Sequence, residues 1–90
     1  MMTFEKLAKV VADDFNEAVI RGGFESFGEM RRSYDWEMSD IKDEVRYITD
    51  EFAKESGEDC WMADDNSFIV VGFDDMSWGN FRKLFMQFVK

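Results

Sequence analysis

Residues 39–73 read SDIKDEVRYITDEFAKESGEDCWMADDNSFIVVGF, and this stretch decides the fold because its periodicity changes partway along. In its first half, apolar residues recur at steps of four, three and four, at Ile41, Val45, Ile48 and Phe52. These steps are typical of an amphipathic helix. We predict a helix over residues 39–56, with Ser39 as its N-cap and Gly57 as its stop.

After Glu58 the pattern becomes extended. Residues 60–63 and 68–73 are short apolar runs, and the polar residues 64–67 separate them. This arrangement predicts a β-hairpin with a four-residue loop. An isolated hairpin is only marginally stable in water, so one of its faces should pack against helices.

Two helices are expected before this stretch. Apolar residues spaced by three and four predict the first helix over residues 3–21, with Thr3 as N-cap and Gly22-Gly23 as the stop. Ser26 and Glu29 fit a capping box, in which the glutamate reaches back to the serine N–H. This second helix should end near Asp35 and bury Phe27, Met30 and Tyr34.

A final helix should begin after Ser77 and bury an apolar side that contains Trp78, Phe81, Leu84, Phe85 and Phe88. The prediction is a single α+β domain over residues 1–90, mainly helical, with the order helix, helix, helix, β-hairpin, helix. The expected core comes from three helices: Phe4, Leu7, Val11 and Phe15; Ile41, Val45, Ile48 and Phe52; and Phe81, Leu84, Phe85 and Phe88. In element order alone, the chain resembles a winged helix, whose second and third helices read DNA and whose hairpin forms the wing.

The charge of the chain is concentrated in residues 35–65. This segment holds twelve acidic and three basic residues, so the whole net charge of −9 belongs to it. An acidic protein is repelled by phosphate backbones and anionic membranes and attracted to basic protein surfaces. We therefore expect no direct nucleic-acid partner and no membrane partner.

Several function classes lose support from composition. The chain has no histidine, which is the commonest general base and zinc ligand, and it has no glycine-rich phosphate loop. Residues 64–75 have the span of an EF-hand loop, but Phe68 and Ile69 stand where an oxygen ligand and a glycine are needed. We expect no enzyme activity, no cofactor and no metal.

The single cysteine, Cys60, excludes an internal disulfide and should be a small buried side chain. Charged residues interrupt Met1–Phe15, where a secretory signal needs an apolar run. No uncharged stretch reaches the ~20 residues that cross a bilayer. These features predict a cytoplasmic protein.

The leading hypothesis is a non-enzymatic module that binds a basic protein surface. In its most concrete form the acidic segment imitates nucleic acid and inhibits a nuclease or another DNA- or RNA-handling protein, as mobile elements do. The predicted contacts are the acids of the third helix and of the hairpin tip together with two aromatic residues: Asp40, Asp43, Glu44, Asp50, Glu51, Glu55, Asp64, Asp65, Trp36 and Tyr47.

Other functions remain open. A small adaptor or homodimer could use the aromatic surface, with the acids serving solubility only. A winged-helix DNA binder is disfavoured, because its third helix would present acids to the bases. The hypothesis of mimicry requires that the carboxylates lie together on one side of the folded molecule.

Overall fold

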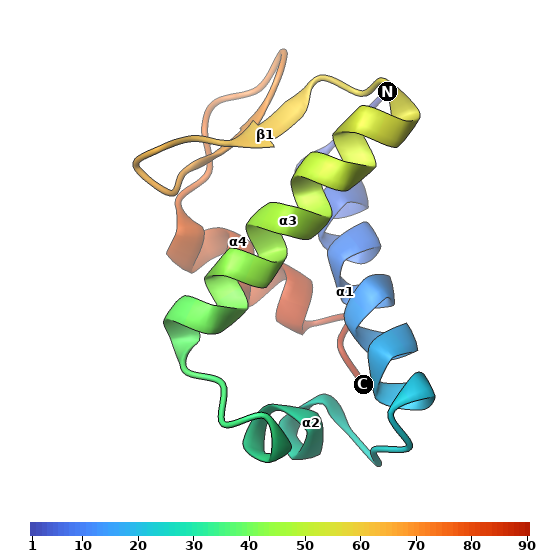
Figure 1. The fold of residues 1–90 in the computed structure, drawn as a ribbon. Coiled ribbons are helices and arrows are strands. Elements are labelled where there is room, and N and C mark those ends of the chain that lie inside the picture. Colours follow the sequence, from blue (N-terminus) through green and yellow to red (C-terminus); the bar gives the residue numbers. More distant parts are fainter.

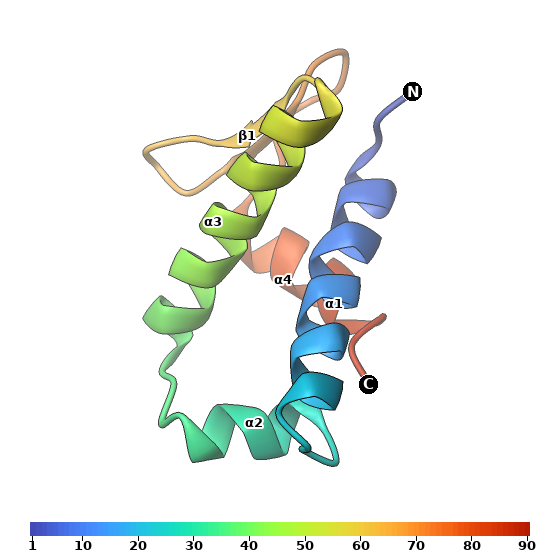
Figure 2. The same ribbon diagram turned by 45° about the vertical axis from the view of Figure 1, so that its right-hand side comes forward.

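Two long helices, α1 (Phe4–Arg21) and α3 (Met38–Ser56), form the frame of the molecule. In the computed structural model, which describes residues 1–90, α4 (Trp78–Met86) packs mainly on α1, and the hairpin packs on α3 (Figure 1). The short α2 (Phe27–Ser33) packs against α1 and lies across the lower end of the frame (Figure 2). The fold class and the element order agree with the prediction from sequence.

The ends of α1 and α2 follow local sequence rules. Thr3 Oγ1 accepts a hydrogen bond from the Lys6 N–H at 3.1 Å, and Ser26 Oγ accepts one from the Glu29 N–H at 3.1 Å. The predicted capping box of α2 is wrong in its second half. Glu29 Oε2 accepts from the Glu25 N–H at 2.9 Å, one residue before Ser26, because the chain enters the helix with that N–H also unpaired.

The start of α3 differs from the prediction by two residues. Ser39 is not the N-cap; Glu37 occupies that position, and its own N–H donates to Asp40 Oδ2 at 2.8 Å. The Asp40 carboxylate therefore satisfies a backbone donor and also lies at the positive end of the helix dipole. Gly57 ends α3 as predicted, in the left-handed conformation with φ +74°.

The hairpin is shorter than predicted. β1 (Cys60–Met62) pairs antiparallel with β2 (Phe68–Val70), and the loop has five residues, 63–67, rather than four. The prediction that β2 runs to Phe73 is wrong, because the chain turns at Gly72, which has φ +97°. It then returns so that Met76 pairs with the free edge of Phe68, with N–O distances of 2.7 and 2.9 Å.

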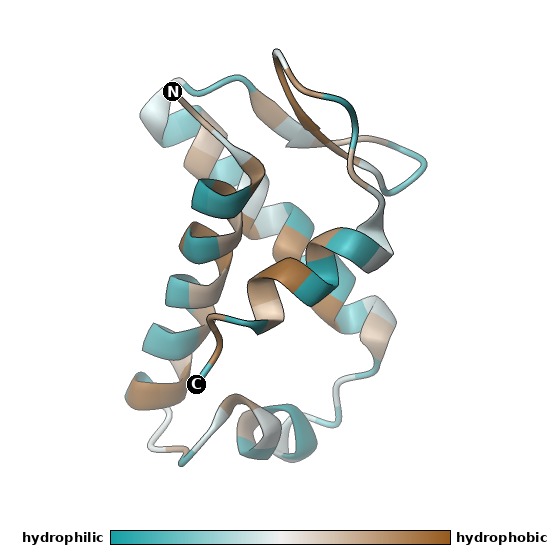
Figure 3. Ribbon diagram, turned by 180° about the vertical axis from the view of Figure 1, so that it is seen from behind, coloured by the Kyte–Doolittle hydropathy of each residue, from teal (hydrophilic) through white to brown (hydrophobic).

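The core contains eight of the twelve side chains expected from α1, α3 and α4, and one face of the hairpin adds to it. The eight are Leu7, Val11, Phe15, Ile41, Val45, Ile48, Phe81 and Phe85. Phe68 of β2 stacks on Phe81 of α4 with ring centroids 3.8 Å apart. Cys60, Met62 and Val70 are also buried, as the packing argument for the hairpin requires. Seen from behind, the strands are mainly hydrophobic and their connecting loop is hydrophilic (Figure 3).

The burial predictions are wrong for a few aromatic and apolar side chains. Tyr34 is 53% exposed rather than buried, because α2 ends at Ser33 and the tyrosine becomes its C-cap. Phe88 lies beyond the end of α4 and is only half-buried. Four other residues assigned to the core pack at its edge and are also half-buried: Phe4, Phe52, Trp78 and Leu84.

The last three residues are tied to the helical frame by polar bonds. Asn16 of α1 donates from Nδ2 to the Phe88 carbonyl at 3.1 Å and accepts from the Lys90 N–H at 2.9 Å. The Phe27 N–H at the start of α2 donates to the Lys90 carbonyl at 3.0 Å. These bonds hold α2 and the chain end against α1, although no apolar periodicity marks them.

Candidate functional site

The acidic side of α3 is defined here by six carboxylates: Asp40, Asp43, Glu44, Asp50, Glu51 and Glu55. Since an α-helix turns by ~100° per residue, these six positions fall within about 140° of its circumference. The buried residues Ile41, Val45, Ile48 and Thr49 lie outside this arc, and Ile48 adjoins it beside Glu55. Five of the six acids are exposed and Glu51 is half-buried, so the carboxylates share one solvent-facing side of the helix.

Two of the three bases on α3 lie outside that arc and are used within the fold. Arg46 Nη1 donates to the Met62 carbonyl at 2.9 Å, and Nη2 donates to the Ala63 carbonyl and to Asn66 Oδ1, both at 3.2 Å. Lys42 Nζ lies 6.0 Å from the centroid of the Trp78 ring. Neither base is therefore placed to neutralise the acidic side of α3.

The third base, Lys54, lies within the acidic arc. Its Nζ is 3.7 Å from Glu51 Oε1, and this exposed contact is the only ion pair within residues 35–65. Exposed pairs of this kind contribute at most about 1 kcal/mol. The negative charge of the segment is thus largely uncompensated by direct contacts.

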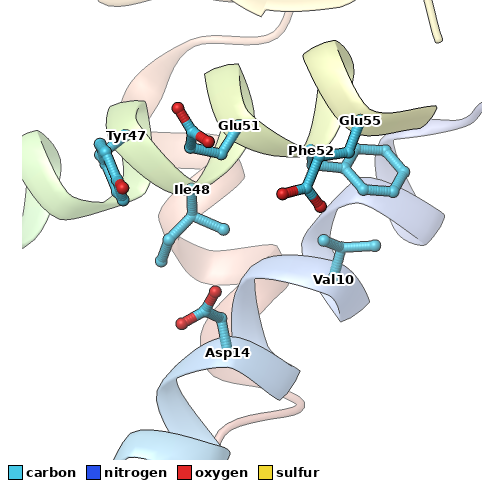
Figure 4. A pocket seen from close by; sticks show the side chains of 7 residues that line it. All are labelled: Val10, Asp14, Tyr47, Ile48, Glu51, Phe52 and Glu55. Carbon is cyan, nitrogen blue, oxygen red and sulfur yellow. The ribbon is translucent and has the colours of Figure 1, made fainter. Parts of the chain in front are cut away.

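A groove between α1 and α3 borders the acidic side. Its volume is about 310 Å³, and its apolar lining is Val10, Ile48 and Phe52. We call it the acidic groove, because Asp14 from α1 meets two carboxylates and a tyrosine from α3 there: Glu51, Glu55 and Tyr47. Asp14 points toward α3, and Glu55 points toward the space between the helices (Figure 4).

The pKa of Asp14 is shifted by its partial burial and by charged neighbours on its own helix. Partial burial raises the pKa of the Asp14 carboxyl above its ordinary 3.8, and the nearby negative charge of Glu17 raises it further, against a smaller lowering effect of Arg21. Desolvation and like charges both disfavour the ionised form. A cation placed in the acidic groove would relieve this penalty.

The hairpin tip places two more carboxylates in solvent. Asp64 and Asp65 are both exposed. Asp65 Oδ1 accepts from Ser67 Oγ at 2.6 Å and from the Ser67 N–H at 3.0 Å, and these hydrogen bonds lower the pKa of the Asp65 carboxyl. The Arg46 bonds to residues 62–66 fix the tip beside α3.

The two predicted aromatic contacts are in different environments. Tyr47 is 63% exposed on α3 and lines the acidic groove. Trp36 is half-buried before α3 and packs at the edge of the core, with its ring centroid 6.4 Å from Phe15 and 5.3 Å from Tyr34. Only Tyr47 therefore belongs to the same surface as the α3 carboxylates.

Other chemistry has little support from geometry. Cys60 is buried, and desolvation raises the pKa of its thiol, with nearby acids raising it further, so it is a poor nucleophile at neutral pH. No group of three histidine, cysteine or acidic side chains is arranged to hold a metal ion. None of the helices combines the length and the apolar character required to cross a bilayer.

Sequence reasoning missed two residues that shape this site. Asp14 joins the acidic groove only because α1 packs beside α3, and nothing in its local pattern indicates this. Arg46 could be seen as a base in an acidic helix, but its bonds to the hairpin depend on tertiary packing.

Comparison of the chain with protein-family models, with curated proteins and with solved structures gave no match.

Proposed function

We propose that this protein is a non-enzymatic binding module that uses the acidic side of α3, the acidic groove and the hairpin tip to contact a basic protein. The observation that carries the proposal is the separation of charge around α3. Its carboxylates share the solvent-facing side, while Lys42 and Arg46 are turned toward α4 and the hairpin. A basic partner would therefore meet carboxylates with little competing positive charge.

The most specific form of the proposal is occupation of a nucleic-acid site. Between residues 40 and 55, α3 rises about 22 Å, so its six acids average about one carboxylate per 4–5 Å, from which the single positive charge of Lys54 is subtracted. A DNA strand carries one charge per ~3.4 Å. The charge density of α3 approaches that of a single strand but not that of a duplex, and Asp64 and Asp65 extend the charged region beyond the helix.

The experiment is affinity capture of partners by the wild-type protein and by two variants that each remove three charges. One variant carries Asp43→Asn, Glu44→Gln and Asp50→Asn. The control carries Asp13→Asn, Asp74→Asn and Asp75→Asn, which are exposed acids outside residues 35–65. We expect a basic partner that the α3 variant loses and the control retains, that duplex or single-stranded DNA displaces, and that elutes near 1 M salt, where the Debye length is ~3 Å.

A partner that is not basic, or that stays bound to both variants equally in high salt, would exclude this function. Loss of the partner from both variants would show that net charge alone, and not the acidic side of α3, is responsible.

A second candidate is a homodimer or adaptor that uses exposed apolar residues of the hairpin region. Trp61 is 44% exposed, Val71 57% and Phe73 45%. Aromatic side chains such as Trp61 and Phe73 are enriched at protein interfaces. Sedimentation discriminates between the candidates, because this one predicts a dimer whose mass does not change with salt.

A further inference from the structure

A second cavity lies away from the acidic side of α3. It is enclosed by α2, the first turn of α3 and α4, and its volume is about 180 Å³. We call it the α2–α4 pocket. Its apolar lining consists of two phenylalanines, one isoleucine and two methionines: Phe27, Phe85, Ile41, Met38 and Met86. Phe27, Ile41 and Phe85 are core residues, so the floor of the pocket is built on the rigid part of the fold.

Two arginines complete the lining, Arg31 from α2 and Arg82 from α4. Both side chains are half-buried, and neither forms an ion pair, although the chain carries 20 acidic residues. Arg31 Nε donates to the Trp36 carbonyl at 3.1 Å, which fixes its position and leaves its two terminal nitrogens free of protein partners. Arg82 has no side-chain hydrogen bond to protein.

This combination differs from the rest of the molecule. Two guanidinium groups without a carboxylate partner border an apolar pocket in a protein of net charge −9. An apolar pocket with a few convergent polar groups is the usual form of a small-molecule site. Guanidinium groups bind carboxylates through paired, charge-assisted hydrogen bonds.

The size of the pocket limits the ligand. An apolar cavity of ~150 Å³ holds one benzene molecule. The α2–α4 pocket therefore has room for a single ring or a short branched chain, and the flexible Met38 and Met86 side chains can adjust to its shape. A long fatty acid or a nucleotide would not fit.

We propose that the α2–α4 pocket binds a small amphiphilic anion, namely a single apolar ring or short branched chain that carries one carboxylate. The apolar part lies against Phe27, Ile41 and Phe85, and the carboxylate accepts hydrogen bonds from Arg82 and from the free nitrogens of Arg31. This site is separate from the acidic side of α3, so the inference does not depend on the proposed function.

The test is a titration of the full chain followed by amide NMR shifts, with phenylacetate as the probe and phenylacetamide as its neutral control. Phenylacetate is expected to shift the amides around Ile41 and Phe85 in the millimolar range or below, and phenylacetamide is expected to bind at least tenfold more weakly. Arg82→Gln should weaken phenylacetate binding about tenfold, because a hydrogen bond to a charged group is lost. The matched control is Arg32→Gln, an exposed arginine of α2 that does not line the pocket.

A second variant tests the pocket without disturbing the core. Met86 is 42% exposed, so Met86→Glu should leave the core intact. It places a carboxylate one helical turn from Arg82, where the two can pair, and should abolish phenylacetate binding. The proposal is overturned if phenylacetate causes no localised shifts, if the acid and the amide bind equally, or if Arg32→Gln weakens binding as much as Arg82→Gln does.

Discussion

Arg46 shows how a charged residue in an acidic helix can serve the fold rather than the surface. Its guanidinium group bonds to the Met62 and Ala63 carbonyls and to Asn66 Oδ1, and so connects α3 to the hairpin. The hairpin has only three residues in each strand, so it depends on such contacts from outside the sheet. Arg46 therefore holds the hairpin tip, which carries Asp64 and Asp65, beside α3.

Arg46→Met should keep most of the aliphatic packing and remove all three hydrogen bonds. One hydrogen bond to a charged group contributes about 1.5–3 kcal/mol. Because Arg46 is half-buried and water can replace part of these bonds, we expect the free energy of unfolding to fall by about the value of one bond and not three. Lys54→Met removes the same charge from the exposed part of α3 and should change stability by less than about 1 kcal/mol. Urea unfolding measures both, and equal effects of the two variants would show that Arg46 acts only through its charge.

Thr49 is the opposite case, a polar group buried without a partner. The residue is fully buried, and its Oγ1 forms no hydrogen bond. Thr49→Val retains the shape and removes the desolvated hydroxyl, so it should raise the free energy of unfolding by about 1 kcal/mol. The same substitution at Thr3 removes the N-cap of α1 and should lower it by about 1 kcal/mol. Destabilisation by Thr49→Val would mean that the hydroxyl does have a partner, such as a buried water.

At the scale of the elements, the packing of α1 beside α3 forms the acidic groove. Asp14 lines this groove, and its pKa is raised in the folded protein, chiefly by partial burial and then by the charge of Glu17. A raised pKa means that ionisation of Asp14 opposes folding. Relative to the ionised form, the protonated carboxyl stabilises the fold; this stabilisation is complete below the ordinary pKa of 3.8 and is lost as the pH rises through the folded pKa. The penalty is fully present at neutral pH.

Asp14→Asn is therefore expected to raise the urea midpoint at pH 7, and this gain should shrink as the pH falls through the folded pKa of Asp14 toward 3.8 and be small below 3.8. Asp13→Asn removes the same charge from the neighbouring position, which does not line the acidic groove, and serves as the control. Asp65→Asn should act in the opposite direction, because hydrogen bonds from Ser67 lower the pKa of Asp65 and favour the fold when the carboxylate is ionised. A gain for Asp14→Asn that is independent of pH would exclude this mechanism.

The elements also show what the sequence could and could not predict. Apolar spacing and caps are local, so α1, the start of α2 and the end of α3 were predicted to within a residue or two. The start of α3 was missed because Asp40 accepts from the Glu37 N–H, which makes Glu37 and not Ser39 the N-cap. Tyr34 was placed in the core from its spacing alone, but the helix ends before it can face inward.

The candidate sites were less predictable for a physical reason. One part could be predicted: helical periodicity places the six carboxylates of α3 on a common side of that helix. The groove and the pocket could not. The acidic groove joins Val10 and Asp14 to residues 47–55, and the α2–α4 pocket joins Phe27 to Met86. Both depend on how helices far apart in the chain pack, which no local pattern contains.

At the scale of the whole molecule, the uncompensated charge should govern stability. The molecule measures 38 × 24 × 20 Å, so at ~0.01 M salt the Debye length of about 30 Å lets the carboxylates repel one another across most of it. At ~0.15 M salt that length falls to about 8 Å, and only neighbouring charges interact. Because the carboxylates of α3 neighbour one another on one side of the helix, some repulsion should persist even then.

Melting temperature measured against NaCl concentration tests this arrangement. The wild-type protein should become more stable as salt rises from ~0.01 to ~0.15 M, since screening reduces self-repulsion. The triple α3 variant Asp43→Asn, Glu44→Gln, Asp50→Asn should melt higher than the wild type at low salt and respond less to salt. The control Asp13→Asn, Asp74→Asn, Asp75→Asn changes net charge equally but removes acids from other parts of the surface, so its effect should be smaller. Equal effects of the two triple variants would mean that the repulsion is spread over the whole molecule. The acidic side of α3 would then have no local excess of repulsion, and the electrostatic argument for a basic partner at that side would fail.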